Sequence, residues 1–351
     1  MADLVVAGAG MAGLVAAAHA RERGASVLLL EKGPEPGGSM ALSSGWIWRY
    51  RKLEEFRAQC PGGDPTLQWT VWERLDDDLA WLETIAGPAW DRDTGNPLTT
   101  GARFDPRSLT QALVARVGEI LCDEPLRRLP SEVPVVLATG GFQGNRELVR
   151  RYVTAEAEHL ILRANPWSAG DALELAVARG AELSNGMDEF YGRNLPAAPH
   201  ISPAKFVALA QLYARFARVE NERGEAYEPK TWSEIDVVQW TARQPGASAW
   251  YVVPETVMDE RVRERSVRDM IDAARDAGAR VDEGDGETRV PVRAGITTTL
   301  GGLRIDADAR VTDGLYAAGA DAGGISTGGY SSGLAAALVF GRIAAESALR
   351  S

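Results

Sequence analysis

The chain has few cysteines, few histidines and no long apolar run, and each shortage excludes a class of protein. Its 351 residues include two cysteines, Cys60 and Cys122, without CxxC spacing, so neither a disulfide framework nor an iron–sulfur site is expected. The three histidines are scattered and give no metal-ligand spacing, so we expect no metal. No stretch of about 18 apolar residues is present that could cross a membrane. These shortages favour a protein of the reducing cytoplasm without membrane insertion.

Basic residues are fewer than acidic ones. The formal net charge is −11, and no run of lysine and arginine interrupts it. Such a field repels polyanions, so nucleic acid and anionic membranes are disfavoured as partners and a small-molecule substrate is favoured. The length exceeds that at which one hydrophobic core stops growing, which predicts two domains.

The N-terminal residues 4–30 predict a strand, a glycine turn, an alanine-rich helix and a second strand. In such a βαβ unit Gly8 makes the sharp turn, Gly10 lets a pyrophosphate approach the backbone, and Gly13 lets helix and strand pack closely. Glu31 follows the second strand, where a carboxylate binds ribose hydroxyls. The alternative is a glycine-rich turn of any α/β protein, and it is disfavoured because strand, helix and Glu31 are in register. A dinucleotide is expected.

Three later segments favour FAD over NAD, because an FAD site must bind the flavin ring as well as the pyrophosphate. Residues 37–45 supply glycines and serines beside the pyrophosphate and ribityl chain, with a plain loop as the alternative. Residues 135–141 read as a buried strand ending in Thr-Gly-Gly, at the strand edge where open α/β sheets bind ligands. Residues 314–334 read as a strand, a glycine-rich loop and the start of a helix capped by Ser331 or Ser332. The N-terminus of that helix would stabilise negative charge on reduced flavin, unless the helix merely packs.

Several motifs occur in a characteristic order. They are VVAGAGMAGLVAAAHARERGASVLLLEKGPEPGGSMALSSG, LATGGFQGN, GDALELAVARGAEL, VENERGEAY, TTTLGGLRID, GLYAAGADAGG and ALVFGRIAAESA. Together they resemble the flavoprotein family of fumarate reductase and succinate dehydrogenase, which includes 3-ketosteroid dehydrogenases and tricarballylate dehydrogenase. The resemblance spans nearly the whole chain.

The resemblance implies an α/β fold with a Rossmann-type FAD domain and a smaller inserted α+β capping domain. The FAD domain would comprise residues 1–188 and 296–351, and the capping or substrate domain residues 189–295. In this family hydride moves between flavin N5 and a substrate carbon, while the neighbouring carbon gains or loses a proton. Residues 37–48 contain no histidine for covalent attachment, so noncovalent FAD is expected.

The glycine turns and the resemblance together assign the expected FAD contacts to six parts of the chain. The expected contacts are Gly8, Gly10, Met11, Ala12, Gly13, Glu31, Lys32, Gly38, Ser39, Ser43, Ser44, Gly45, Ala138, Thr139, Gly140, Gly319, Ala320, Asp321, Ser332, Gly333 and Leu334.

The chain departs from the family pattern at positions that bind substrate or flavin. Thr297 and Thr298 stand where the fumarate reductase branch has histidines that bind a substrate carboxylate, and neither carries positive charge. Ala320 replaces a Glu or Asn that contacts the flavin, and Asp321 beside it is expected to substitute. These departures disfavour dicarboxylate reduction.

Phenols and arginines are the remaining candidates for catalysis. Tyr330 could donate a hydrogen bond to a developing enolate, with packing in a glycine-rich turn as the alternative. Tyr191 and Arg193 stand at the predicted entrance to the capping domain, with a structural role as the alternative. Trp46 and Trp48 alternate along a predicted strand, which packing explains as well as an apolar substrate pocket does.

The sequence predicts an FAD-dependent dehydrogenase or reductase that desaturates or reduces a C–C bond next to a carbonyl or carboxylate. One alternative is a flavoprotein that uses FAD structurally or for nonredox isomerisation or hydration. A further alternative is a noncatalytic paralogue that binds a partner protein. No haem motif or second dinucleotide fingerprint identifies the electron acceptor or donor.

Overall fold

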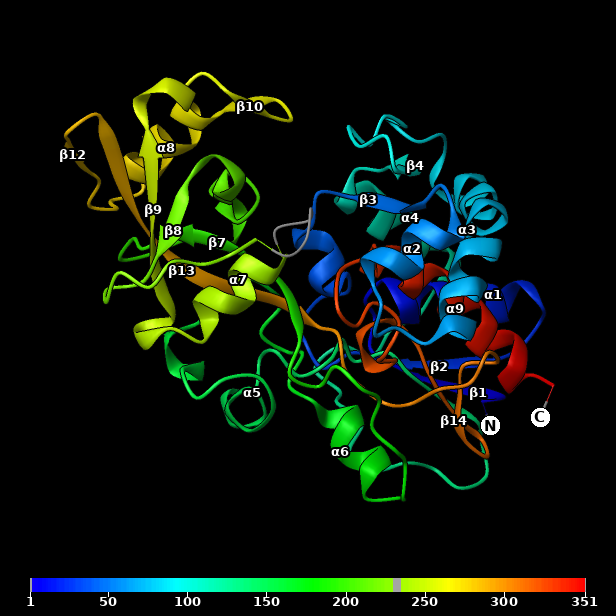
Figure 1. Ribbon diagram of the computed structural model, residues 1–351. Helices are drawn as coiled ribbons and strands as arrows, with labels where there is room; N and C mark the ends of the chain where they lie inside the picture. Colours follow the sequence, from blue (N-terminus) through cyan, green and yellow to red (C-terminus); the bar gives the residue numbers. More distant parts are fainter. Residues whose placement is uncertain (1, 230–234, 351) are drawn as a thin grey trace. The chain divides into compact units, whose positions relative to one another are not determined.

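The computed structural model describes residues 2–229 and 235–350, and the chain divides into two compact units (Figure 1). The first unit comprises Met1–Asn145, Asn165–Glu189 and Thr298–Ser351, and the second comprises Arg146–Ala164 and Phe190–Thr297. Apart from shifts of one or two residues at Glu189 and at residues 296–297, this division differs from the predicted one at residues 146–164, which were expected in the FAD domain. They group with the second unit because Ile161–Leu162 form a strand that pairs with the sheet of that unit.

The first unit is built on a sheet with the strand order β14-β15-β5-β1-β2. Its strands are β1 (Leu4–Ala7), β2 (Val27–Leu30), β5 (Val135–Leu137), β14 (Arg310–Thr312) and β15 (Leu315–Ala317). β15, β5, β1 and β2 run parallel, and β14 pairs antiparallel with β15. The apolar run of β5 is fully buried, as expected for a parallel strand covered on both faces. The predicted α/β class is confirmed.

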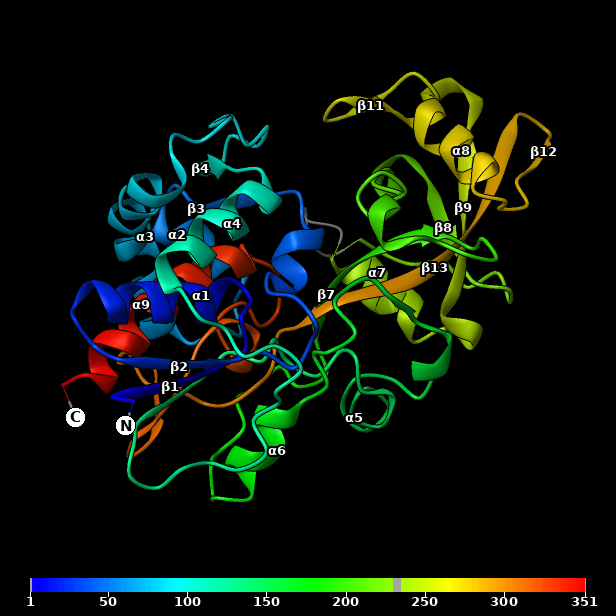
Figure 2. The same ribbon diagram turned by 180° about the vertical axis from the view of Figure 1, so that it is seen from behind.

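Two helices from opposite ends of the chain lie side by side on this sheet. In both views α1 (Met11–Glu22) and α9 (Gly333–Ala348) lie next to each other, on the same side of β1 and β2 (Figures 1 and 2). Their small residues permit this closeness, since a Cβ on Gly341 would lie 2.7 Å from the carbonyl oxygen of Ala12. The helices bring the two ends of the chain to one place in the fold.

The remaining elements of the first unit surround these two helices and the sheet. They are the 3-10 turn η1 (Gly38–Leu42), strands β3 (Trp46–Tyr50) and β4 (Thr99–Arg103), which pair antiparallel, helices α2 (Leu53–Gln59), α3 (Pro65–Ala86), α4 (Pro106–Val117) and α6 (Asp171–Val177), and the 3-10 turn η7 (Gly319–Asp321). α3 and α4 begin alike, with an aspartate N-cap followed by proline at the first helical position.

The second unit is built on a mixed sheet in the order β12-β13-β9-β8, with β6 and β7 also paired to β13. Its strands are β6 (Ile161–Leu162), β7 (Phe190–Pro196), β8 (Arg218–Glu220), β9 (Ser248–Pro254), β12 (Asp282–Gly284) and β13 (Glu287–Thr299), and β10 (Arg261–Val262) pairs with β11 (Arg265–Ser266). Its helices are α5 (Arg146–Tyr152), α7 (Ile235–Ala242) and α8 (Val267–Asp276), with 3-10 turns at Ala157–His159, Pro203–Lys205, Ala214–Phe216, Pro245–Ala247 and Glu255–Val257.

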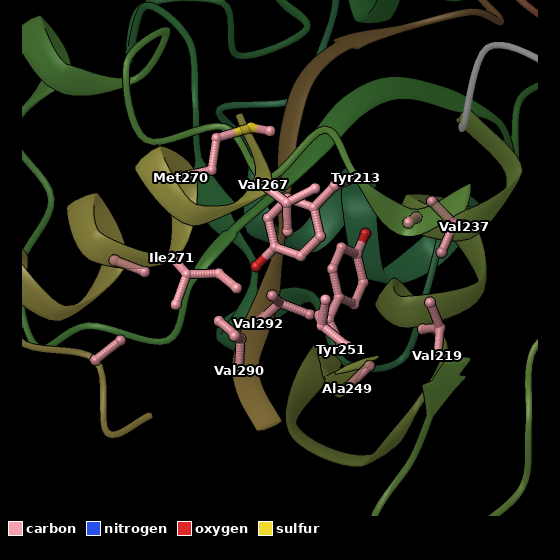
Figure 3. Close-up of a cluster of buried hydrophobic side chains, with 14 of the residues drawn as sticks. Tyr213, Val219, Val237, Ala249, Tyr251, Val267, Met270, Ile271, Val290 and Val292 are labelled. Carbon is pink, nitrogen blue, oxygen red and sulfur yellow. The ribbon is translucent and has the colours of Figure 1, made fainter. Parts of the chain in front are cut away.

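The core of the second unit lies between α8 and the sheet (Figure 3). Tyr213 and Tyr251 are buried at its centre, with ring centroids 5.4 Å apart and nearly perpendicular planes. Val290 and Val292 of β13 and Met270 of α8 pack against them. This core makes the second unit a compact body by itself.

Across residues 2–229 and 235–350, no helix is both long enough and apolar enough to span a membrane.

Candidate cofactor site

The first glycine turn is pressed against the end of β5. Gly8 has a φ of +99°, and a Cβ there would lie 2.2 Å from the carbonyl oxygen of Ala138. Its N–H donates to the carbonyl of Leu30 at 2.7 Å. Only glycine satisfies both constraints, so this position fixes the turn against two neighbouring strands.

The next two glycines differ in their surroundings, because Gly13 is closely packed and Gly10 faces open space. A Cβ on Gly13 would lie 1.8 Å from the oxygen of Gly8, so the helix and the turn touch there. A Cβ on Gly10, by contrast, would meet no described atom within 4 Å. Gly10 is the N-cap of α1, and Met11 and Ala12 open the helix. The open space therefore lies at a helix N-terminus, where backbone N–H groups and the helix dipole favour a phosphate.

Glu31 holds the turns on either side of it. Its carboxylate accepts hydrogen bonds from the N–H groups of Ala9 and Gly33, both at 2.7 Å, and the residue is 5% exposed. Each carboxylate oxygen retains a second lone pair, so binding of ribose hydroxyls stays a prediction. Lys32 forms an ion pair with Asp171 at 2.7 Å.

The second glycine cluster lies beside the first. The N–H of Gly37 donates to the carbonyl of Ala9 at 2.8 Å, and a Cβ on Gly38 would lie 3.2 Å from the Cα of Gly10. The Ser39 hydroxyl accepts a hydrogen bond from the Asn165 backbone at 3.1 Å.

The small residues that follow are held by β4 and the segment after it. The N–H of Gly45 donates to the Ser43 hydroxyl at 3.0 Å, and Arg103 donates to the carbonyl of Ser44 at 3.2 Å. A Cβ on Gly45 would lie 1.8 Å from the oxygen of Phe104. Gly45 is therefore a packing glycine, whereas Ser43 and Ser44 keep partial exposure.

A buried carboxylate joins the loop after β5 to the turn after β15. Asp321 is 2% exposed and accepts hydrogen bonds from the N–H and hydroxyl of Thr139 and, at 2.9 Å, from the N–H of Gly141. Burial raises the pKa of Asp321, and hydrogen bonds from Gly141, Thr139 and Gly140 lower it, with a net rise. The side chain expected to contact flavin thus binds the neighbouring loop.

The turn after β15 also reaches the start of α1. Gly319 has a φ of +67°, and a Cβ there would lie 3.1 Å from the Cβ of Ala12. Ala320 lies next to the loop after β5, since a Cβ on Gly141 would be 3.2 Å from its Cβ. Both residues remain partly exposed.

The last helix is capped by Ser332, one of the two serines predicted for this position. α9 starts at Gly333, and the hydroxyl of the N-cap Ser332 accepts a hydrogen bond from the N–H of Ala335 at 3.3 Å. Gly333 is exposed and Leu334 partly exposed, so the first-turn amides are accessible. The positive end of the helix dipole therefore faces an accessible part of the unit.

Tyr330 lies against the aromatic face of β3. The hydroxyl of Tyr50 donates to the carbonyl of Tyr330 at 2.9 Å, and the rings of Tyr330 and Trp48 meet edge to face with centroids 5.8 Å apart. The Ser332 hydroxyl donates to the carbonyl of Trp46 at 3.3 Å. The strand thus places Tyr330 and the start of α9.

These contacts bring the expected cofactor segments of the first unit together at the carboxyl ends of β1, β5 and β15. Most of the expected contact residues are partly exposed, although the strands that carry them are buried. The partly exposed residues are Gly8, Gly10, Lys32, Gly38, Ser39, Ser43, Ser44, Thr139, Gly140, Gly319, Ala320 and Leu334. Two helix N-termini lie between glycine turns, one beside the open space at Gly10 and the other exposed at Gly333, and they suit a ligand with a pyrophosphate and a ring that becomes anionic on reduction. The residues present therefore fit FAD.

The second unit contains the other two candidates. Tyr191 and Arg193 lie on β7, and the guanidinium carbon of Arg193 is 5.4 Å from the centroid of the Tyr191 ring. Burial raises the pKa of Tyr191, but Arg193, Arg163 and Arg263 lower it, so it falls to about 8. Sequence reasoning missed Arg163 because it directly follows the two-residue strand β6, which carries no periodic signal.

Comparison with known proteins gives a family and several relatives. The model of a family described as "FAD binding domain" matches residues 3–73 and 127–333. A vinyl phenol reductase of Lactiplantibacillus plantarum is 26% identical over 237 residues, which are 54% of this chain and 48% of the relative. The chain thus spans about half the length of that reductase. A cytochrome-type fumarate reductase of Shewanella frigidimarina is 22% identical over 99% of this chain and 77% of the relative.

A similar solved structure is that of 3-ketosteroid-Δ4-(5α)-dehydrogenase from Rhodococcus jostii in complex with 4-androstene-3,17-dione. It superposes with a TM-score of 0.72 at 20% identity, covering 100% of this chain and 97% of that chain. At this identity the likeness shows the fold.

Proposed function

The chain belongs to the FAD-binding domain family, and from that membership we propose that it is an FAD-dependent oxidoreductase. The reaction proposed is transfer of hydride between flavin N5 and a C–C bond next to a carbonyl or carboxylate, as desaturation or as ene reduction. The family confirms the expected cofactor, FAD, and its fumarate reductase and ketosteroid dehydrogenase relatives confirm the resemblance. We further propose that the FAD is noncovalent.

The observation that carries the proposal is the meeting of separate glycine turns at two helix N-termini. In the proposed arrangement the first-turn amides of α1 bind the pyrophosphate beside Gly10, where space for it exists. The amides of α9 at Gly333 and Leu334 stabilise negative charge on the reduced ring, by about 0.3–2 kcal/mol. The first unit is accordingly proposed as the FAD domain and the second as the capping and substrate domain.

Tyr330 is proposed to polarise the substrate oxygen. Its phenol donates a hydrogen bond to the carbonyl oxygen, and that bond strengthens as enolate charge develops. The hydrogen bond from Tyr50 to its carbonyl and the contact with Trp48 hold it in place. Trp48 adds a flat apolar surface beside it, which suits a planar substrate and excludes water. Tyr191 and Arg193 are proposed to act on the substrate from the second unit.

We propose a cytoplasmic location, supported by the two unpaired thiols, Cys60 and Cys122. The electron partner is proposed to be a separate molecule.

The test is anaerobic mixing of FAD-loaded protein with saturated cyclic ketones and carboxylic acids, and of dithionite-reduced protein with their unsaturated counterparts. Bleaching of the flavin absorbance in the first set, or its return in the second, gives the direction of the reaction. Absence of both, with FAD bound, contradicts the proposal.

Tyr330→Phe tests the assigned residue. Loss of a general acid or polarising donor is expected to slow flavin reduction or reoxidation about 100-fold or more without releasing FAD. Tyr316→Phe is the matched control, because it loses only a hydrogen bond at 3.3 Å to the Ser347 carbonyl near the other end of α9. Equal rates in Tyr330→Phe and the parent would remove Tyr330 from the mechanism.

A further inference from the structure

The second unit gathers positive side chains around one phenol. Tyr191 and Arg193 are two residues apart on β7, so their side chains lie on the same face of the strand. The guanidinium of Arg193 lies over the Tyr191 ring at 5.4 Å. Both side chains are partly exposed, so a ligand can reach them.

A second arginine is fixed beside this pair by the neighbouring strand. The N–H of Arg163 donates to the carbonyl of Ile296 at 2.8 Å, and its Nη1 donates to the hydroxyl of Thr297 at 2.9 Å. Its Nε reaches the carbonyl of Phe206 at 3.4 Å. The guanidinium is thus held in a defined position against β13, and it brings positive charge to Thr297, a residue that carries none.

Glycine lets the two arginine-bearing segments approach. A Cβ on Gly192 would lie 2.0 Å from the oxygen of Gly295. A Cβ on Gly295 would lie 2.9 Å from the oxygen of Arg193 and 3.5 Å from the Cβ of Arg163. Any larger residue at these glycines would force β7 and β13 apart and separate the two arginines.

We propose that the guanidinium groups of Arg163 and Arg193, the Tyr191 phenol and the Thr297 hydroxyl form a binding site for the carboxylate of an organic acid. This deepens the proposed function and rests on it, because it selects an unsaturated or saturated acid over a neutral ketone as the substrate. Planar guanidinium groups match the two oxygens of a carboxylate, and two neutral hydroxyls complete a donor set.

Binding at this site depends on pH through Tyr191. The charged groups that act on the phenol are Arg193 of β7, Arg163 beside β13 and Arg263 of the β10–β11 turn, and with them the pKa is lowered to about 8. A phenolate and a bound carboxylate use the same arginines, so each weakens the other. The acid therefore binds more tightly below pH 8 than above it. The total loss of affinity is about tenfold for each unit by which the bound acid raises the pKa of Tyr191.

The experiment measures binding of benzoate and of its neutral counterpart benzamide to the FAD-loaded protein by calorimetry at pH 7 and pH 10. Benzoate is expected to bind at least tenfold more tightly than benzamide at pH 7 and to weaken at pH 10. Arg163→Gln and Arg193→Gln are expected to lower the benzoate affinity at least tenfold. Arg280→Gln removes an exposed arginine of the same unit and is expected to change nothing.

Tyr191→Phe supplies a readout that a merely structural role would not move. The difference between parent and variant in absorbance near 295 nm is expected to show one phenol that ionises near pH 8, and benzoate is expected to shift that ionisation upward. In Tyr191→Phe the benzoate affinity is expected to be equal at the two pH values.

The results separate this proposal from the proposed function. Equal binding of benzoate and benzamide, or benzoate binding that both arginine variants leave unchanged, would overturn the carboxylate site even if neutral ketones bleach the flavin. Selective benzoate binding that is lost in both arginine variants would support the site even if no compound bleaches the flavin.

Discussion

Replacing Asp321 by asparagine removes the charged link between two expected cofactor loops while keeping the size of the side chain. The carboxylate accepts three hydrogen bonds, from the N–H and hydroxyl of Thr139 and from the N–H of Gly141. Asparagine offers one acceptor oxygen, and its NH₂ group would face donors where the second carboxylate oxygen stood. One or two buried donors then lose their acceptor.

The cost follows from the number of donors. A buried donor without an acceptor costs about 1–3 kcal/mol, which gives about 1–6 kcal/mol for one or two. Burial raises the pKa of Asp321, so the charged form is itself costly and the lower part of that range applies, about 2–3 kcal/mol. Since 1 kcal/mol moves the Tm of a domain of this size by about 2–4 °C, the expected drop is about 4–12 °C.

Thermal unfolding and FAD titration of the same preparations measure both consequences. Asp321→Asn is expected to lower the Tm and to weaken FAD binding about tenfold or more, because both loops lose their fixed position. Asp306→Asn is the matched control: Asp306 also accepts two backbone hydrogen bonds, each at 2.9 Å, but it is exposed. If Asp321→Asn does not fold, Thr139→Val removes only the hydroxyl bond, with an expected cost of about 1 kcal/mol. A Tm and an FAD affinity equal to those of the parent in either variant would refute the reasoning.

Three further changes test other parts of the first unit. The hydrogen bond with His19 lowers the pKa of Glu346 to about 2, so Glu346 contributes stability above its ordinary pKa of 4.5 that is lost as the pH falls toward 2. Because the group is partly solvated, Glu346→Gln is expected to lower the free energy of unfolding by only about 1–2 kcal/mol at pH 7. In urea unfolding the variant is expected to lose less stability than the parent between pH 4.5 and 2, and an unchanged pH profile would contradict this. Burial raises the pKa of the Cys60 thiol to about 12, whereas Cys122 is partly exposed. A thiol reagent at pH 8 is therefore expected to modify Cys122 alone until the protein unfolds. Mass spectrometry that finds modified Cys60 in native protein would oppose this. Gly341→Ala places a Cβ 2.7 Å from a carbonyl oxygen of α1 and is expected to cost about 1–3 kcal/mol and to weaken FAD binding, and a Tm equal to that of the parent would show that the two helices separate freely.

The sequence predicted best those features that depend on neighbouring residues. The strands Leu4–Ala7 and Val27–Leu30 occur as expected, because alternating turn glycines and apolar runs are local signals. The helix start at Ser332 and Gly333 follows from the ordinary preference for serine at an N-cap. The parallel sheet then follows from the right-handed βαβ connection.

Long-range partners could not be read from the sequence. Asp321 binds Thr139, 182 residues away, and nothing near either residue marks the pairing. Arg163 reaches Thr297 across 134 residues, through a strand of two residues. The same short strand moves residues 146–164 into the second unit. Such contacts depend on tertiary packing, which residue type and periodicity do not encode.

Two buried carboxylates beside the glycine turns, Glu31 and Asp321, raise a question about the charge of the cofactor site. Glu31 and Asp321 stand beside turns expected to bind an anionic cofactor, in a protein whose net charge is already −11. Each accepts hydrogen bonds from backbone N–H groups of the neighbouring turn, and those dipoles offset part of the cost of burying its charge. The first-turn amides of α1 are not consumed in this way, and the space beside Gly10 leaves them open to a phosphate. The acidic residues thus hold the glycine turns in place by accepting their backbone hydrogen bonds. The N-terminus of α1 supplies the positive potential that favours a phosphate.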